Sequence, residues 1–180
     1  MTKPQNTCSI LLIGFFLILP LMNAVAQENQ TESKEEKRER EYNELVQLVE
    51  SGQFEFVGER AFPQRGPQVD ITTRNHLLKI EGNHAIGDLS YFGRSYSGGY
   101  YNSNGGVKFD GEMESHDVSV NDKKYRITVK FRIRGSDDTY NCILTISGYE
   151  AASLSVTSNN KSPIRYTGNI KSTDDSEEID

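Results

Sequence analysis

The residues from Lys124 to Arg134, KYRITVKFRIR, alternate strictly between polar and apolar side chains. A period of two is typical of a β-strand with one dry face and one wet face. The pattern recurs three times further along the chain, at Tyr140, Cys142, Leu144 and Ile146, at Ala152, Leu154 and Val156, and at Ile164 and Tyr166. Short turn sequences rich in Gly, Ser and Asn separate these runs. Four consecutive strands joined by tight turns predict an antiparallel meander.

Weaker strand patterns precede the meander, and together they bring the expected number of short strands to nine or ten. They are centred on Phe54 and Phe56, Val69 and Ile71, Leu78 and Ile80, Ile86 and Leu89, Val107 and Phe109, and Val118 and Val120. The predicted fold class is therefore all-β and mainly antiparallel. Such a sheet must bury one face and protect its edges, which favours a barrel-like or half-barrel meander. A two-sheet sandwich remains the alternative.

One amphipathic helix is expected before the strands, roughly from Lys34 to Glu50. Its apolar residues fall on or beside one face, and Ser51-Gly52 is a typical helix end. Residues 28–40 are almost wholly charged or polar, which indicates a linker or the solvated start of this helix. The expected organisation is a charged linker over 27–40, a single helix-plus-β domain over 41–170 and an acidic disordered tail over 171–180.

The first 26 residues are typical of a cleavable secretory signal peptide. Lys3 precedes an uninterrupted apolar run, Ile10 to Met22, and small residues before Gln27 predict cleavage after Ala26. The run is shorter than the roughly 20 residues that a membrane-spanning helix needs. Cys8 lies before the run, where lipoprotein processing does not use it. We expect a periplasmic or secreted protein with no stable membrane anchor after cleavage.

Charge and motif content argue against several function classes. The net charge is −6, and it becomes −7 when the predicted signal peptide, with one lysine and no acidic residue, is removed. An acidic protein of this kind is a poor general binder of nucleic acid. No nucleophile elbow, zinc-protease helix, C-x-x-C pair or phosphate-binding loop is present in the sequence. The three histidines are scattered. The sequence therefore predicts a non-enzymatic protein without a metal or a cofactor.

Cys142 is the single cysteine left after the predicted cleavage, so no internal disulfide can form. Its position in an alternating strand predicts a small buried hydrophobic side chain.

The segment from Tyr91 to Asp110, YFGRSYSGGYYNSNGGVKFD, has the most unusual composition in the chain, with five glycines, four tyrosines, two phenylalanines and one arginine. Tyrosines offer flat apolar faces with a polar tip, and an arginine can hold a carboxylate or an acidic headgroup. One hypothesis is a ligand-facing loop with candidate binding residues Tyr91, Phe92, Arg94, Tyr96, Tyr100 and Tyr101. The other is a structural connection whose aromatic residues close one end of the barrel, with Arg94 in an ion pair.

A second candidate is a basic stripe on the wet face of one strand, formed by Lys124, Arg126, Lys130, Arg132 and Arg134. Such clustering suits acidic glycans or lipid headgroups. Cross-strand pairing with nearby carboxylates is the alternative, and the expected partners are Glu112, Glu114, Asp117, Asp137 and Asp138.

Several short boxes occur in a fixed order along the chain, and together they resemble the exported bacterial family known as domain of unknown function 4251. The boxes are Phe54-Glu55-Phe56, Ala61-Phe62-Pro63-Gln64, Tyr91 to Tyr96, Gly105 to Phe109, Ser158-Asn159-Asn160 and Tyr166 to Ile170. The resemblance covers roughly residues 45–170. It implies a compact, β-rich, barrel-like fold, gut-type bacteria as the usual source, and at most a lipid-binding role. It defines no catalytic residues.

Two functions remain open. In the first, the protein binds a small apolar or amphipathic ligand such as a lipid, with the Tyr/Gly segment and Arg94 at the mouth of the barrel. In the second, it is a cell-envelope interaction or structural module with a filled core. Large strand residues such as Phe54, Tyr125 and Tyr166 favour a filled interior, because a small barrel has little other room. The oligomeric state is not specified by the sequence.

Overall fold

A computed structural model describes residues 33–74, 76–96, 106–148 and 151–173. The chain divides into two units, Met1–Thr31 and Glu32–Asp180, and all described residues belong to the second. The predicted signal peptide lies outside the described residues. The elements are α1 (Lys34–Ser51), β1 (Gln53–Pro63), β2 (Val69–Asp70), β3 (Leu77–Glu81), β4 (His84–Ser90), β5 (Gly106–Asn121), the short 3-10 helix η1 (Asp122–Lys124), β6 (Arg126–Arg134), β7 (Thr139–Ser147), β8 (Ala151–Ser158) and β9 (Ile164–Ser172).

The strands form one antiparallel sheet that closes on itself. Its order is β2-β1-β3-β4-β5-β6-β7-β8-β9, and β1 also pairs with β9 from Phe54 opposite Ser172 to Pro63 opposite Ile164. Eight strands make the closed barrel, and the two-residue β2 is an addition beside β1. The predicted all-β, barrel-like class with one N-terminal helix is confirmed, and the sandwich is not observed.

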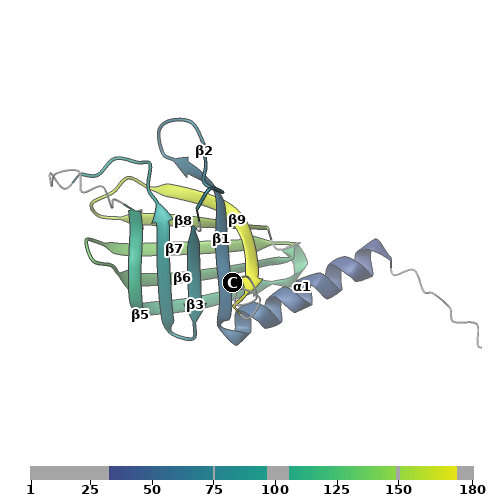
Figure 1. Ribbon diagram of the computed structural model, residues 1–180. Coiled ribbons are helices and arrows are strands. Elements are labelled where there is room, and N and C mark those ends of the chain that lie inside the picture. The colour runs from purple at the N-terminus through teal and green to yellow at the C-terminus, as the bar shows by residue number, and fades with distance from the viewer. Residues whose placement is uncertain (1–32, 75, 97–105, 149–150, 174–180) are drawn as a thin grey trace, which may run out of the picture. The chain divides into compact units, whose positions relative to one another are not determined.

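The barrel has two layers because its long strands bend. The first half of β5 pairs with β4 and the second half with β6, and the register shifts between Met113 and Ser115. A second shift occurs in β1 between Gly58 and Arg60. Bulges of this kind bend a strand and increase its twist. As a result, β1 and β3 run across β6, β7 and β8 (Figure 1).

Helix α1 begins in the charged segment and packs through its C-terminal half. Ser33 and Glu36 form a reciprocal capping box, and Gly52 ends the helix with a φ of 68°. Tyr42 packs edge to face on Tyr125 with ring centroids 5.2 Å apart, and the other buried residues of the helix are Leu45 and Val49. The first two turns are exposed. No helix among the described residues has the length and apolar character needed to cross a bilayer.

Tyr125 lies outside the strand that its alternating pattern predicted. It follows η1 with a φ of 46°, and β6 begins one residue later at Arg126. From Arg126 onward the predicted alternation is confirmed, since the even-numbered residues of β6 are outside and the odd-numbered ones are buried.

Large side chains occupy the barrel interior. The largest that are fully buried are Tyr140, Tyr166, Phe54, Phe56, Leu78, Ile80, Leu89, Ile127, Ile133, Leu144, Ile146 and Leu154. Cys142 is buried among them as a free thiol, as predicted, and burial raises its pKa. The core is thus formed by the protein's own side chains, as the residue sizes suggested.

Candidate functional site

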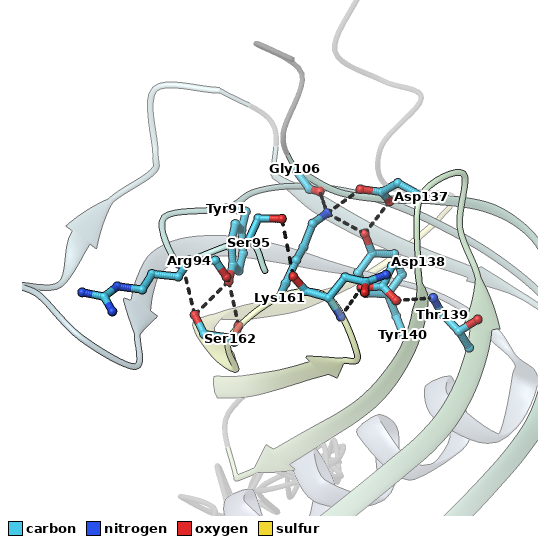
Figure 2. Close-up of polar contacts among 11 residues, drawn as sticks. Tyr91, Arg94, Ser95, Gly106, Asp137, Asp138, Thr139, Tyr140, Lys161 and Ser162 are labelled. Atoms are coloured by element: carbon cyan, nitrogen blue, oxygen red, sulfur yellow. Dashed lines mark hydrogen bonds and ion pairs between the residues drawn. The ribbon is translucent and has the colours of Figure 1, made fainter. Parts of the chain in front are cut away.

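The loops opposite the α1 side of the barrel hold a polar cluster and a groove. In an antiparallel barrel the end of β4, the β6–β7 turn and the β8–β9 loop lie at the same end as the start of β5. We call this the loop end. Residues 91–96 of the Tyr/Gly segment are described there (Figure 2).

Lys161, in the β8–β9 loop, is the centre of the polar cluster. Its side chain is buried, with 7% of the residue exposed. The Nζ donates to the carbonyl oxygen of Gly106 at 2.7 Å, to Asp137 Oδ2 at 2.8 Å and to the Tyr140 hydroxyl at 2.8 Å. An ammonium has three N–H donors, so all of them are used. Lys161 has no hydrogen left to offer a ligand.

Asp137 and Tyr140 complete this cluster. The Tyr140 hydroxyl donates to Asp137 Oδ1 at 2.8 Å while it accepts from Lys161. Burial raises the pKa of Tyr140, and the neighbouring Asp137 raises it further. Burial alone would raise the pKa of Asp137, but hydrogen bonds from Lys161 and Tyr140 lower it overall. The cluster therefore holds an ion pair beside a neutral phenol, an arrangement that stabilises the loops.

Residues 91–96 are fastened to the β8–β9 loop by a second set of bonds. The Tyr91 hydroxyl lies 2.7 Å from the Arg94 carbonyl oxygen and 2.9 Å from both the carbonyl and the hydroxyl oxygen of Ser162. The Arg94 N–H donates to Ser162 Oγ at 3.0 Å, and the Ser162 N–H donates to the Arg94 carbonyl at 2.9 Å. The Tyr96 N–H donates to the Asn160 carbonyl at 2.7 Å. The Tyr91 hydroxyl thus connects residues 91–96 to the β8–β9 loop.

Gly93 is required by this arrangement. A Cβ on Gly93 would overlap the Tyr91 hydroxyl and would lie 2.6 Å from Ser162 Oγ.

Burial raises the pKa of Tyr91, so its hydroxyl stays protonated. Tyr91 is partly buried and packs against the hydrophobic core.

A groove of about 400 Å³ lies beside residues 91–96. Phe92 and Tyr96 line it with exposed fractions of 41% and 65%. The Arg94 guanidinium points away from the Lys161 cluster, although the Arg94 backbone is bonded to Ser162 (Figure 2). The remaining lining comes from Ser162, Gly93 and the turn between β1 and β2, Gln64, Arg65 and Gly66.

The structure therefore divides the six predicted binding residues. Phe92, Arg94 and Tyr96 share the groove, whereas the side chain of Tyr91 bonds to the loop. Tyr100 and Tyr101 lie outside the described residues. Arg65 was not predicted as a binding residue, and its only sequence signal is its place beside the Ala61-Phe62-Pro63-Gln64 box. Lys161 was not predicted either, because a lysine in a polar loop is ordinarily solvated.

The basic stripe is only partly paired. Lys124 lies in η1, and the other four residues are exposed on the outer face of β6. Of the pairings expected, the described residues contain Arg132 with Glu114, whose Nε and Oε2 are 2.9 Å apart. Asp137 binds Lys161, and Asp138 accepts the backbone N–H groups of Thr139 and Asn160.

No group of three or more potential metal ligands occurs among the described residues. His84 pairs with Asp110 through Nε2 and Oδ1 at 2.8 Å on the exposed surface. His76 is buried, and burial lowers its pKa.

Comparison with known proteins identifies the family. The model of a domain of unknown function, DUF4251, matches residues 36–170. The chain belongs to the DUF4251 family. A crystal structure of a DUF4251 family protein from Bacteroides eggerthii DSM 20697 is similar in fold, with a TM-score of 0.61, 18% sequence identity, and coverage of 77% of this chain and 92% of that chain. No curated protein matches the chain.

Two of the boxes that resemble the DUF4251 family meet in space. The Tyr91 to Tyr96 box and the loop that follows Ser158-Asn159-Asn160 bond through backbone and hydroxyl groups at the loop end. A third box starts β5, where Gly106 supplies the carbonyl oxygen that Lys161 binds. Three boxes of this DUF4251 chain therefore contribute to the loop end.

Proposed function

We propose that the protein is an exported, non-enzymatic binding module that holds a small amphipathic ligand with an acidic group. The ligand occupies the groove at the loop end, because large side chains fill the barrel interior. The observation that carries this proposal is the shared lining of two arginines, Arg65 and Arg94, and two exposed aromatic residues, Phe92 and Tyr96. The volume of the groove, about 400 Å³, lies within the ordinary range for small-molecule sites.

The chemistry of the lining suits a fatty acid or a similar carboxylate. A guanidinium binds a carboxylate through paired N–H donors. The aromatic rings give an alkyl chain apolar area to cover. Arg94 contributes to the fold through its backbone, so its guanidinium is available for a ligand.

Calorimetric titration with sodium dodecanoate tests the proposal. We expect binding by the wild type and about tenfold weaker binding by Arg94→Ala and Arg65→Ala, since each loses roughly one charged hydrogen-bond pair. Arg74→Ala removes an exposed arginine that does not line the groove and is the matched control. Circular dichroism should be unchanged in all three. Equal affinities for wild type and Arg94→Ala, or no binding by the wild type, would contradict the proposal.

Export has its own test. We expect the mature protein in the periplasmic or culture fraction, with Gln27 at its N-terminus by mass spectrometry. A full-length protein retained in the membrane fraction would argue for an uncleaved anchor.

The second candidate is a cell-envelope interaction module with a filled core. The observation that favours it is the set of fully buried large residues inside the barrel. Cross-linking in intact cells distinguishes this function from ligand binding. An interaction module should form a defined protein adduct even in a strain whose copy of the protein does not bind dodecanoate.

A further inference from the structure

The outer face of strands β6 to β9 has a one-sided charge distribution. These four strands contain six basic residues and no acidic residue, in a chain whose net charge is −6. Their outward positions otherwise carry mainly hydroxyl and amide side chains. We call this surface the β6–β9 face. Its basic residues are Arg126, Lys130, Arg132, Arg134, Arg165 and Lys171.

The basic residues of β6 form a row. The strand is fully extended, so Arg126 and Arg134 are about 27 Å apart along the row, and Lys130, Arg132 and Arg134 follow at intervals of about 7 Å. The Debye length at physiological salt is about 8 Å, so neighbouring charges in this row act together. Like charges at this spacing repel one another, and an anionic partner relieves that repulsion.

Acidic residues neutralise the positive charge of the β6–β9 face only at its border with β5. Arg132 is bonded to Glu114 on β5. Among the described residues, Arg126, Lys130 and Arg134 form no ion pair, although Asp117 lies opposite Lys130 in the register. Arg165, three strands away, packs over the Phe62 ring with its guanidinium carbon 4.5 Å from the centroid.

From these features we propose that the β6–β9 face binds an acidic polysaccharide. The carboxylate or sulfate groups of the polymer meet the basic row, and its hydroxyl groups meet the serine, threonine and asparagine side chains of β7 to β9. The face is about 14 Å wide over its four strands, enough for one extended chain. A membrane surface fits less well, since Ile143, 43% exposed, is the one large apolar side chain that the described part of this face presents. The site is separate from the groove at the loop end.

Binding of defined polymers tests the proposal. The probes are polygalacturonate, which is carboxylated, heparin, which is sulfated, and neutral dextran. Each is titrated at the physiological ionic strength of about 0.15 M. We expect the wild type to bind both acidic polymers, to lose affinity as salt rises, and not to bind dextran. The double variant Lys130→Ser, Arg134→Ser should bind at least about tenfold more weakly, as the loss of two charged contacts implies.

The control has the same charge change at another surface. Lys34→Ser, Arg74→Ser removes two exposed basic residues that lie outside the β6–β9 face, and its affinity should stay within about twofold of the wild type. An equal loss in both double variants would show that net charge, and not this face, determines binding, and would overturn the proposal.

Two further outcomes would also overturn it. One is binding to anionic phosphatidylglycerol vesicles, dependent on Lys130 and Arg134, without binding to either acidic polymer. The other is polymer binding only by a chain that ends at Thr173, which would identify the acidic residues 174–180 as the occupant. Loss of dodecanoate binding in Arg94→Ala with polymer binding intact would show that the two sites are independent.

Discussion

Lys161 is a charged side chain at a buried position, and its surroundings explain why it is stable there. Burying an ammonium without partners costs several kcal/mol. Here a carboxylate, a phenol and a carbonyl oxygen accept its three hydrogens, and the rings of Tyr91 and Tyr140 lie 5.7 and 5.3 Å from Nζ. Lys161 therefore connects the start of β5, the β6–β7 turn and the β8–β9 loop.

Lys161→Met should destabilise the protein, because it leaves the carbonyl of Gly106 and the Asp137–Tyr140 pair without their donor. We expect a loss of about 1–3 kcal/mol in the free energy of unfolding, measured by urea titration. The exposed Lys123→Met is the control and should change stability by less than about 0.5 kcal/mol. An unchanged midpoint for Lys161→Met would contradict the assigned role.

Asp137 should give the loop end a dependence on acid. Its folded-state pKa is lowered overall, since the bonds from Lys161 and Tyr140 outweigh the effect of burial. A carboxyl whose pKa is lower in the folded state stabilises the protein above the unfolded-state value of about 3.9, and this contribution disappears as the pH falls through the folded-state value.

The measurement is the difference in unfolding free energy between the wild type and Asp137→Asn from pH 7 to pH 3. We expect the difference to be largest near neutral pH and to shrink in acid, because asparagine does not titrate. A difference that is constant over this range would show that Asp137 acts through hydrogen bonding alone.

The sequence predicted part of the groove and none of the Lys161 cluster, for a physical reason. Phe92, Arg94 and Tyr96 belong to one short segment of unusual composition, so the sequence of that segment alone indicates all three. Lys161 meets Gly106 and Asp137 across 55 and 24 residues of chain. Contacts of this kind depend on which strands close the barrel, and residue types along the chain do not encode that locally.

The same limit appears among the strands. The four-strand meander was predicted from its strict alternation and is confirmed by the pairings of β6 with β7, β7 with β8 and β8 with β9. The two patterns at Val107 and Val118, however, belong to the single strand β5. The register shift after Met113 breaks the alternation, so one bent strand resembled two straight ones.

The pairing of β1 with β9 depends on close backbone approach at Gly168. A Cβ there would overlap the carbonyl oxygen of Val57 and would lie 3.0 Å from the Gly58 Cα. Gly168→Ala should therefore lower the free energy of unfolding by about 1–3 kcal/mol or more, as overpacking does.

Gly111→Ala is the matched control for this strand prediction. Gly111 lies in β5, and a Cβ there meets no atom within 4 Å. We expect that variant to be neutral or slightly stabilised, since alanine restricts the unfolded chain more than glycine does. Both variants are compared by thermal unfolding, and equal melting temperatures would mean that β9 can shift without cost.

At the scale of the whole barrel, β9 should be indispensable while the residues after it are not. A chain that ends at Pro163 lacks Ile164, Tyr166 and Ile170 from the core and leaves β1 and β8 as open edges. Open edges promote aggregation. We expect this chain to aggregate in size-exclusion chromatography, whereas a chain that ends at Thr173 keeps every strand and should elute and melt like the full chain.

The β1–β9 ladder also determines when this barrel can be completed. A ribosome makes β1 first and β9 last, so for most of its synthesis the chain carries an early strand whose partner does not yet exist. Pairings between distant parts of a chain form slowly, because the entropy of loop closure is lost before the new contacts stabilise the chain. Until β9 is made, the nascent protein is an open sheet whose edge strands can pair with another chain. This interval is the period in which it most needs protection by a chaperone.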